Sequence, residues 1–369
     1  MKIREYILLT LALCLFATGC SQDAGQEGQI PDTEPLFMNI IPEAEGGYSL
    51  VSVSPFDGSR DTLLVQRPLR RLIVMSTSHV GFLSAVGGDS AIVGVSGGEY
   101  VCDSSMARRI DQGEVVDVGF DASPDYEKIL ALQPDLLLAY SVSPVKSRFL
   151  SKVESLGIKT FIVNEHLERH PLARAAYVRL FGALTGNMPA ADSVLNVVSE
   201  NYNSLRDSVQ AGLKNDRHRK ILVNIPYKDQ WFIPGQENYL SHLFEDAGGE
   251  ILGAEAGSSV SGQISVERAY ALSKEADLWM NVGWCLTESQ LLSVNPLFED
   301  FLRNIKTNAS SKGFDSQSVV WNDNRRLNAK GGNDFWESGV VRPDLLLRDL
   351  VGIFKSDTTC VPEYYRRIK

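Results

Sequence analysis

The chain has 369 residues, and its composition, 44% hydrophobic and 22% charged, is ordinary for a globular protein. This length exceeds what a single hydrophobic core usually serves, so two domains are expected. The formal net charge of -10 argues against nucleic acid as a partner, because phosphate binding requires a basic surface.

The first twenty residues combine a basic start, an apolar run and a cysteine. The apolar run, 6–16, is too short to span a bilayer, and small residues then lead to Cys20. The pattern resembles a bacterial lipoprotein signal peptide over residues 1–19, although Ala17 stands where leucine is more usual. Cleavage before Cys20 would expose its thiol for lipidation, which anchors an exported protein to a membrane without spanning it. Plain secretion, with Cys20 incidental, is the alternative.

A short polar stretch and a predicted hairpin follow the signal. Residues 20–35 have too few apolar groups to order themselves and are predicted to form a flexible tether. Two alternating runs, 48–53 and 62–66, flank turn residues 55–58, which predicts a β-hairpin ahead of the main domain. No later segment has the ~18 uninterrupted apolar residues of a transmembrane helix.

Between residues 36 and 186, apolar runs alternate with helical patterns. Continuous apolar runs are typical of strands buried on both faces of a sheet. Strands alternating with helices at this spacing indicate a parallel, doubly wound sheet, which with the hairpin forms an N-terminal α/β lobe. The predicted strands are 71–75, 91–95, 136–140 and 159–163, and the predicted helices are 80–86, 127–132, 149–156 and 173–184.

Residues 187–213 are assigned to a helix that connects two lobes. Within them, 190–209 carries apolar residues at helical spacing. A helix of that length spans roughly 30 Å and limits relative lobe motion more than a Gly/Ser linker does. A second α/β lobe, 214–369, is predicted to contain a first strand at 220–225 and helices at 239–247 and 344–354.

One pattern occurs twice, in residues 123–140 and 265–283. Each copy has an acid followed by a base, an Ala-Leu pair, and an Asp-Leu pair that opens an apolar run. A supersecondary unit repeated about 140 residues apart suggests two similar halves. The acids are Glu127 and Glu267, and the aspartates are Asp135 and Asp277.

Further segments appear in a characteristic order around this repeat. They are RLIVMSTSHVGFLSAVGGDSAIVGVSG, VVDVGFDASPDYEKILALQPDLLLAY, LGIKTFIVN, LFGALTG and, after the long helix, PGQENYLSHLFEDAGG. This series resembles the substrate-binding proteins of ATP-driven importers for ferric siderophores, haem and cobalamin, over roughly residues 69–354. The resemblance implies two Rossmann-like lobes with parallel-rich sheets, joined by one long α-helix, that hold a metal chelate between them and catalyse no reaction.

The same resemblance assigns Glu127 and Glu267 to docking on arginines of the membrane permease. A glutamate in the first turn of a helix is favoured by the helix dipole and can bind an arginine through two parallel hydrogen bonds. Either residue alone would more often be a solvated surface acid. Their matching places in two lobes favour the docking role.

A cleft for a large chelate requires apolar walls on which a ligand can stack. In such folds these walls lie at the carboxyl ends of the strands. A single aromatic residue more often fills a core than lines a wall. Trp231 and Trp284 rank highest, because each directly follows a predicted strand. The candidates are Tyr100, Phe120, Tyr140, Trp231, Trp284, Trp321 and Trp336.

Arg325, Arg326 and Lys330 form a basic cluster near the expected mouth of the second lobe. If the cluster faces the cleft, it favours an anionic ligand, and we therefore prefer a ferric siderophore to haem or cobalamin. A solvated loop is the alternative interpretation. His79 follows the first strand and is a candidate contact to the ligand or to a haem iron, with a structural hydrogen bond as the competing role.

Other function classes find less support. A bare-metal binder needs several ligands, and among five histidines only His79 lies where a cleft ligand is expected. A glycosidase would need Glu127 and Glu267 within ~5–10 Å of each other, and neither a nucleophile elbow nor a Gly-rich phosphate loop is present. With these classes less supported, the resemblance implies a monomeric binding protein without a cofactor, with a permease as its protein partner.

Three cysteines fall in the folded part of the chain. Their spacings match no zinc-binding pattern, and their odd number allows at most one disulfide. The sequence leaves the pairing of Cys102, Cys285 and Cys360 open.

Overall fold

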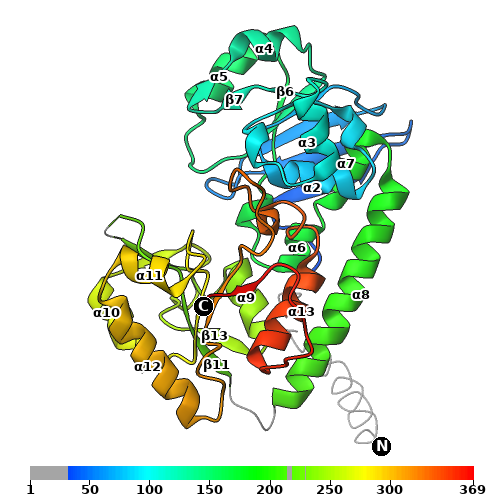
Figure 1. Cartoon of the computed structure of the whole chain (residues 1–369). Coiled ribbons are helices and arrows are strands. Elements are labelled where there is room, and N and C mark those ends of the chain that lie inside the picture. The colour runs from blue at the N-terminus through cyan, green and yellow to red at the C-terminus, as the bar shows by residue number, and fades with distance from the viewer. Residues whose placement is uncertain (1–31, 214–217, 229) are drawn as a thin grey trace, which may run out of the picture. The chain divides into compact units, whose positions relative to one another are not determined.

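The computed structural model describes residues 32–213, 218–228 and 230–369. The predicted signal peptide, Cys20 and the tether up to residue 31 lie outside these ranges. Within the ranges, no helix is long and apolar enough to cross a membrane. Two lobes, each built around its own sheet, make up the described chain (Figure 1).

A three-stranded antiparallel sheet precedes the first lobe. The predicted hairpin is confirmed: β2 (Tyr48–Val53) pairs with β3 (Arg60–Val65). Strand β1 (Met38–Pro42) pairs with the other edge of β2 and is absent from the sequence prediction. Only Met38 of its five residues is buried, so it lacks the alternation that identifies a half-buried strand.

The N-terminal lobe contains a five-stranded sheet covered by helices. Its order is β10-β9-β4-β5-β6, and every neighbouring pair is parallel, which confirms the doubly wound prediction. Strands β4 and β9 are buried along their whole length. The elements are β4 (Leu72–Val74), α2 (Thr77–Ala85), β5 (Ile92–Val95), α3 (Ser104–Asp111), β6 (Val116–Asp117), β7 (Gly119–Phe120), β8 (Ser123–Pro124), α4 (Tyr126–Ala131), β9 (Leu136–Ala139), α5 (Arg148–Ser155), β10 (Thr160–Ile162), α6 (Pro171–Ala175) and α7 (Val178–Thr185).

Residues 173–184, predicted as one helix, belong to two. Helices α6 and α7 are separated by Ala176 and Tyr177. The Tyr177 N–H bonds the Arg174 carbonyl, three residues back, which is the tighter 3₁₀ pattern. The buried Tyr177 hydroxyl donates to Glu168 at 3.0 Å, so a tertiary contact accompanies the break.

Helix α8 (Met188–Leu213) is the long connector, and it runs along one side of both lobes (Figure 1). Its 26 residues correspond to about 39 Å. Helix α7 packs closely on its first turns, because a Cβ at Gly182 would lie 2.6 Å from that of Ala191. Further along, buried Val198 and Tyr202 belong to the core of the second lobe.

The C-terminal lobe repeats the architecture of the first. Its sheet order is β13-β11-β15-β16-β17, and only the β16–β17 pair is antiparallel. Strands β12 and β14 form a separate antiparallel pair. The elements are β11 (Arg219–Val223), β12 (Trp231–Ile233), α9 (Tyr239–Asp246), β13 (Gly249–Ile251), β14 (Gly262–Ile264), α10 (Val266–Ser273), β15 (Leu278–Met280), α11 (Glu288–Val294), α12 (Phe298–Ser311), β16 (Val320–Asn322), α13 (Pro343–Phe354) and β17 (Arg366–Arg367).

The repeated sequence pattern is a repeated structural unit. In one lobe α4 leads to β9, beside β4, and in the other α10 leads to β15, beside β11. The Asp135 carboxylate accepts the backbone N–H groups of Arg70 and Arg71 at 2.8 and 3.0 Å. The Asp277 carboxylate accepts the N–H of Lys220 at 3.0 Å. Each aspartate therefore holds the start of the strand next to its own.

Residues 328–337, which we call the junction segment, connect the lobes a second time. Asn328 donates from its side-chain amide to two carbonyls of the N-terminal lobe, at 2.9 and 3.0 Å. Glu337 is 1% exposed, and its carboxylate accepts the backbone N–H groups of Cys102 and Asp103 at 2.7 and 2.6 Å. The lobes are thus held together by more than the connecting helix.

Candidate functional site

Three predicted aromatic residues lie exposed at the carboxyl end of the N-terminal sheet. Tyr100, Phe120 and Tyr140 are 39%, 43% and 37% exposed. Tyr100 ends the 3₁₀ turn after β5, Phe120 ends β7 after β6, and Tyr140 directly follows β9. The rings of Tyr100 and Phe120 are 6.2 Å apart. Tyr140 meets His166 edge to face at 5.9 Å. Parallel strands bring these side chains to one edge of the sheet, as a ligand wall requires.

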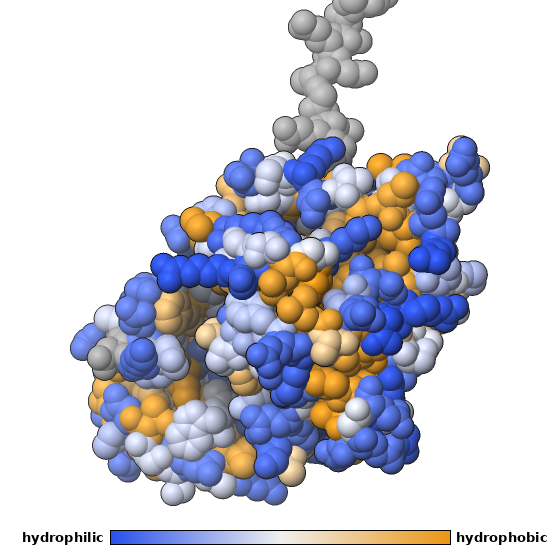
Figure 2. All heavy atoms as spheres, turned by 90° about the horizontal axis from the view of Figure 1, so that it is seen from above, coloured by the Kyte–Doolittle hydropathy of each residue, from blue (hydrophilic) through white to orange (hydrophobic). Residues whose placement is uncertain are grey.

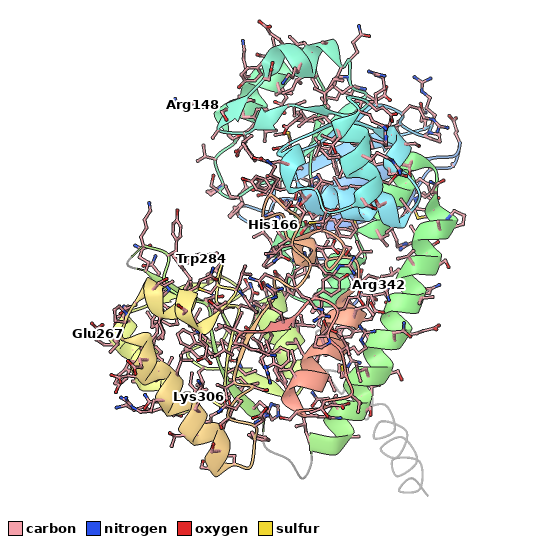
Figure 3. All side chains as sticks on the ribbon, viewed as in Figure 1. Arg148, His166, Glu267, Trp284, Lys306 and Arg342 are labelled. Atoms are coloured by element: carbon pink, nitrogen blue, oxygen red, sulfur yellow. The ribbon has the colours of Figure 1, made fainter. Side chains whose placement is uncertain are left out.

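Exposed aromatics also follow the strands of the C-terminal lobe. Trp284 lies in the loop after β15 and is 61% exposed; the preceding Gly283 has a left-handed backbone with φ of 62°. In Figure 3, Trp284 lies on the lower lobe and His166 on the facing side of the upper lobe. Seen from above, the surface is hollowed beside the N-terminal lobe (Figure 2). Tyr227, in the loop after β11, is 70% exposed; the rule that selected Trp284 would have found it.

Trp231, ranked beside Trp284 by sequence, is a core residue, and its assignment to the wall is wrong. It opens β12, is fully buried, and stacks on Trp279 and Phe301 with ring centroids 6.0 and 5.8 Å apart. Its indole N–H donates to the Val223 carbonyl at 2.9 Å. The residue follows a strand in sequence, but it starts the next strand, which packs on the core.

The remaining two tryptophans differ in their surroundings. Trp321 packs partly buried against the C-terminal core within β16, and its indole N–H donates to the Ser318 carbonyl at 2.9 Å, so it offers little free surface. Trp336 is 40% exposed and lies 6.0 Å from the Arg174 guanidinium of the other lobe. Trp336 therefore stays a candidate wall residue.

His79 is fully buried within α2 and does not reach a cleft, which corrects its assignment as a ligand contact. Its ring lies 5.6 Å from Phe181, and neither nitrogen has a hydrogen-bond partner among the described residues, so the structural hydrogen bond is also absent. Burial lowers the pKa of His79 to about 4. The imidazole is therefore a neutral part of the core.

The central residue of the basic cluster, Arg326, is held by acidic side chains. Arg326 pairs with Asp334 at 2.7 Å and with Glu363, and its guanidinium lies over the Tyr364 ring. It borders a separate cavity of about 710 Å³ beside α2 and α8. Arg325 and Lys330 are exposed. The prediction of an anion-binding mouth is therefore wrong for Arg326, whose charge is already neutralised.

A cavity of about 500 Å³ lies at the carboxyl ends of the C-terminal strands. Asn224, Asn281 and Asp323 each follow one of three adjacent strands, β11, β15 and β16, and line its floor. Asn224 and Asn281 have left-handed backbones, with φ of 67° and 58°, which asparagine tolerates better than most residues. Tyr239 and Trp336 also line the cavity.

Arg174 of α6, in the N-terminal lobe, packs against Tyr239, which lines this cavity. It is buried, its Nε bonds Glu165 at 3.0 Å, and its guanidinium lies 4.7 Å from the Tyr239 ring. Glu165 also accepts the Ser78 hydroxyl at 2.6 Å. Burial alone would raise the pKa of Glu165, but Arg174 and its other neighbours outweigh burial and lower it. The pair is therefore ionised, and Arg174 contacts the C-terminal lobe through Tyr239.

Asp323 is a buried acid among the residues that line the cavity. The residue is 8% exposed, and burial raises the pKa of its carboxyl from 3.8 to about 7. No described residue donates a hydrogen bond to the carboxylate apart from its own backbone. Sequence reasoning missed Asp323, although its place after a strand is the signal that selected the aromatics.

Glu127 and Glu267 lie exposed in the first turns of α4 and α10. Asp125 and Ser265 cap these helices through their side chains. The Ser265 hydroxyl lowers the pKa of Glu267. Both carboxylates are thus presented on the outside of separate lobes, with Glu267 labelled in Figure 3.

Metal-binding groups are sparse in the part of the chain that the structure describes. There, no three His, Cys, Asp or Glu side chains are arranged to hold a metal ion. The thiols of Cys102, Cys285 and Cys360 are free.

Two α/β lobes with parallel-rich sheets, a single long connecting helix and exposed aromatics at facing strand ends define a two-lobed binding protein. The family model described as periplasmic binding protein matches residues 72–310. The chain belongs to this family.

Named relatives and solved structures agree with the family. An uncharacterised lipoprotein of Methanocaldococcus jannaschii is 23% identical over 79% of the chain, which spans 66% of that relative's length. An uncharacterised ABC transporter substrate-binding lipoprotein of Bacillus subtilis, YvrC, is 18% identical over 66% of the chain and 70% of its own.

Among solved structures, a periplasmic haem-binding protein from Pseudomonas aeruginosa has a TM-score of 0.56 at 16% identity, covering 82% of this chain and 98% of its own. The vitamin B12-binding protein BtuF of Vibrio cholerae has a TM-score of 0.52 at 17% identity, covering 78% and 98%. At these identities the likeness shows the fold.

Proposed function

We propose that this protein is the substrate-binding component of an ABC importer, and that it captures a metal chelate between its lobes. The observation that carries the proposal is the pair of exposed aromatic surfaces at the carboxyl ends of the two sheets, represented by Tyr140 and Trp284. Large planar or apolar ligands stack on such surfaces. Lipid on Cys20 would keep the exported, monomeric protein at a bacterial membrane, consistent with its lipoprotein relatives.

The candidate ligands are ferric siderophores, haem and cobalamin. The names of the structural neighbours support haem and vitamin B12 as classes to test. The preference for an anionic siderophore depended on the basic cluster, and Arg326 is paired elsewhere. The aromatic walls support a chelate of any of the three classes.

Delivery to the permease is proposed to depend on Glu127 and Glu267. Both are exposed first-turn glutamates of equivalent helices in the two lobes. Arginine forks on a permease would bind such carboxylates with two parallel hydrogen bonds each.

A tryptophan-fluorescence titration tests the proposal. Protein beginning at Ser21 is titrated with a ferric siderophore, haem and cobalamin, and we expect saturable quenching by at least one. The matched variant Trp284→Phe should bind that chelate more weakly, because its smaller ring stacks less surface. No saturable response to any chelate would contradict the proposed function.

A further inference from the structure

The floor of the 500 Å³ cavity contains a buried acid without a partner. Asp323 lines the cavity and is 8% exposed as a residue, and its carboxylate receives no hydrogen bond from another described residue. Burying a carboxylate without a donor or a counter-ion is costly. Such a group in a native structure calls for an explanation, and a ligand that donates a hydrogen bond to it is one.

The groups around Asp323 explain why it lacks a partner. Tyr239 of α9 and Tyr365, near the C-terminus, are the titratable groups that face it. Arg174 lies beyond, over the Tyr239 ring, and is neutralised by Glu165. No lysine or arginine of the described chain contributes to the Asp323 environment. The position therefore offers negative charge and acceptor atoms.

The neighbouring strand end carries Asn281, whose side-chain oxygen is buried. That oxygen has no hydrogen bond of normal geometry, although the Tyr365 hydroxyl is near it. The Asn281 side chain lines the same floor. Of these two strand ends, the one at Asp323 offers the accessible acceptor atoms, because the Asn281 oxygen is buried beside the Tyr365 hydroxyl.

We propose that Asp323 binds an N–H group of the transported chelate, an ammonium or a primary amide, at the floor of this cavity. The inference rests on the proposed function and narrows its ligand class. It disfavours chelates whose only polar groups at this position are carboxylates, because two carboxylates would repel each other there. The ligand preference is therefore opposite to that expected from the basic cluster.

Two ligand comparisons test the inference. Ferrioxamine B carries a terminal ammonium, whereas the cyclic ferrioxamine E has the same iron-binding hydroxamates without it. Cyanocobalamin carries primary amides, whereas haem carries carboxylates. For whichever comparison gives binding, we expect wild-type protein at pH 8 to prefer the N–H-bearing member by about tenfold to hundredfold.

Asp323→Asn keeps the size of the side chain and removes its charge, so it should abolish the preference for the ammonium. The wild-type preference for ferrioxamine B should also grow from pH 6 to pH 8, as the carboxyl ionises, and the variant should lack this pH dependence. Glu114→Gln, at an exposed acid in a surface pair with Arg109, is the matched control and should leave both unchanged. Equal affinities within a comparison, or a preference that survives Asp323→Asn, would overturn the inference.

A ligand-free measurement separates the inference from the proposed function. If Asp323 awaits a ligand, Asp323→Asn should unfold at the same or a higher temperature than wild type at pH 8. A large loss of thermal stability would show that the carboxylate has a structural partner and would overturn the inference. Failure of all four chelates to bind would instead overturn the proposed function, and the inference with it.

Discussion

Removing the Glu337 carboxylate should loosen the second connection between the lobes. Glu337 accepts two backbone N–H groups, from Cys102 and Asp103, across the lobe boundary. In Glu337→Ala both donors lose their acceptor inside a region where Glu337 was 1% exposed. Each buried donor left without a partner costs about 1–3 kcal/mol, so the loss should be about 2–6 kcal/mol.

The pKa of Glu337 makes this loss depend on pH. Burial raises that pKa from 4.5 to about 7. In the unfolded chain the carboxyl ionises near pH 4.5, whereas in the folded protein it stays protonated up to about pH 7. The stability gained from the protonated folded group is therefore complete below pH 4.5 and is lost as the pH rises to about 7. This change amounts to at most about 3 kcal/mol. Glu337→Ala lacks it, so the variant should be most destabilised at pH 5 and less so at pH 8.

Urea unfolding at pH 5 and pH 8 measures both effects. Interlobe distances from paired spin labels should broaden in Glu337→Ala. Glu114→Ala is the matched control, because Glu114 is an exposed acid in a surface pair with Arg109, and it should change the free energy of unfolding by less than about 0.5 kcal/mol. A Glu337→Ala variant as stable as wild type at pH 5, or equally destabilised at both pH values, would refute the reasoning.

Three further outcomes are expected. Trp231→Ala should lower the free energy of unfolding by about 3–5 kcal/mol, whereas Trp284→Ala should keep urea stability and weaken chelate binding in fluorescence titrations; the reverse pattern would contradict the assignment of core and wall. Asp277→Ala should cost about 1–3 kcal/mol, because the N–H at the start of β11 loses its acceptor, and unchanged urea unfolding would count against this role. Replacing Glu127 and Glu267 together by Gln should weaken pull-down of the permease while chelate affinity stays the same, and loss of chelate affinity instead would refute the docking role.

Much of the fold could be predicted because its strands are buried on both faces. The run 136–140 contains β9, and its continuous apolar residues identify it as a buried strand without any information about the strands it pairs with. The repeat was also visible, since Asp135 and Asp277 each serve the same backbone contact in their own lobe. The break between helices α6 and α7 at Ala176 could not be predicted from local sequence, because it is accompanied by a tertiary contact, the hydrogen bond from Tyr177 to Glu168.

The site was less predictable, because exposure is decided by what packs next. Trp231 and Trp284 follow strands with the same local pattern, yet one starts a strand on the core and the other lies exposed in a loop after Gly283. The sequence placed Arg326 near the expected mouth of the second lobe, but in the structure its guanidinium is paired with Asp334.

The amino-acid sequence by itself determined the alternation of strands and helices, the two similar halves and the long connector, because these depend on local periodicity. Only the tertiary structure decided which aromatic side chains remain exposed, which charges are paired, and that Asp323 is left without a partner. These properties depend on contacts between residues far apart in the chain, which no local pattern records.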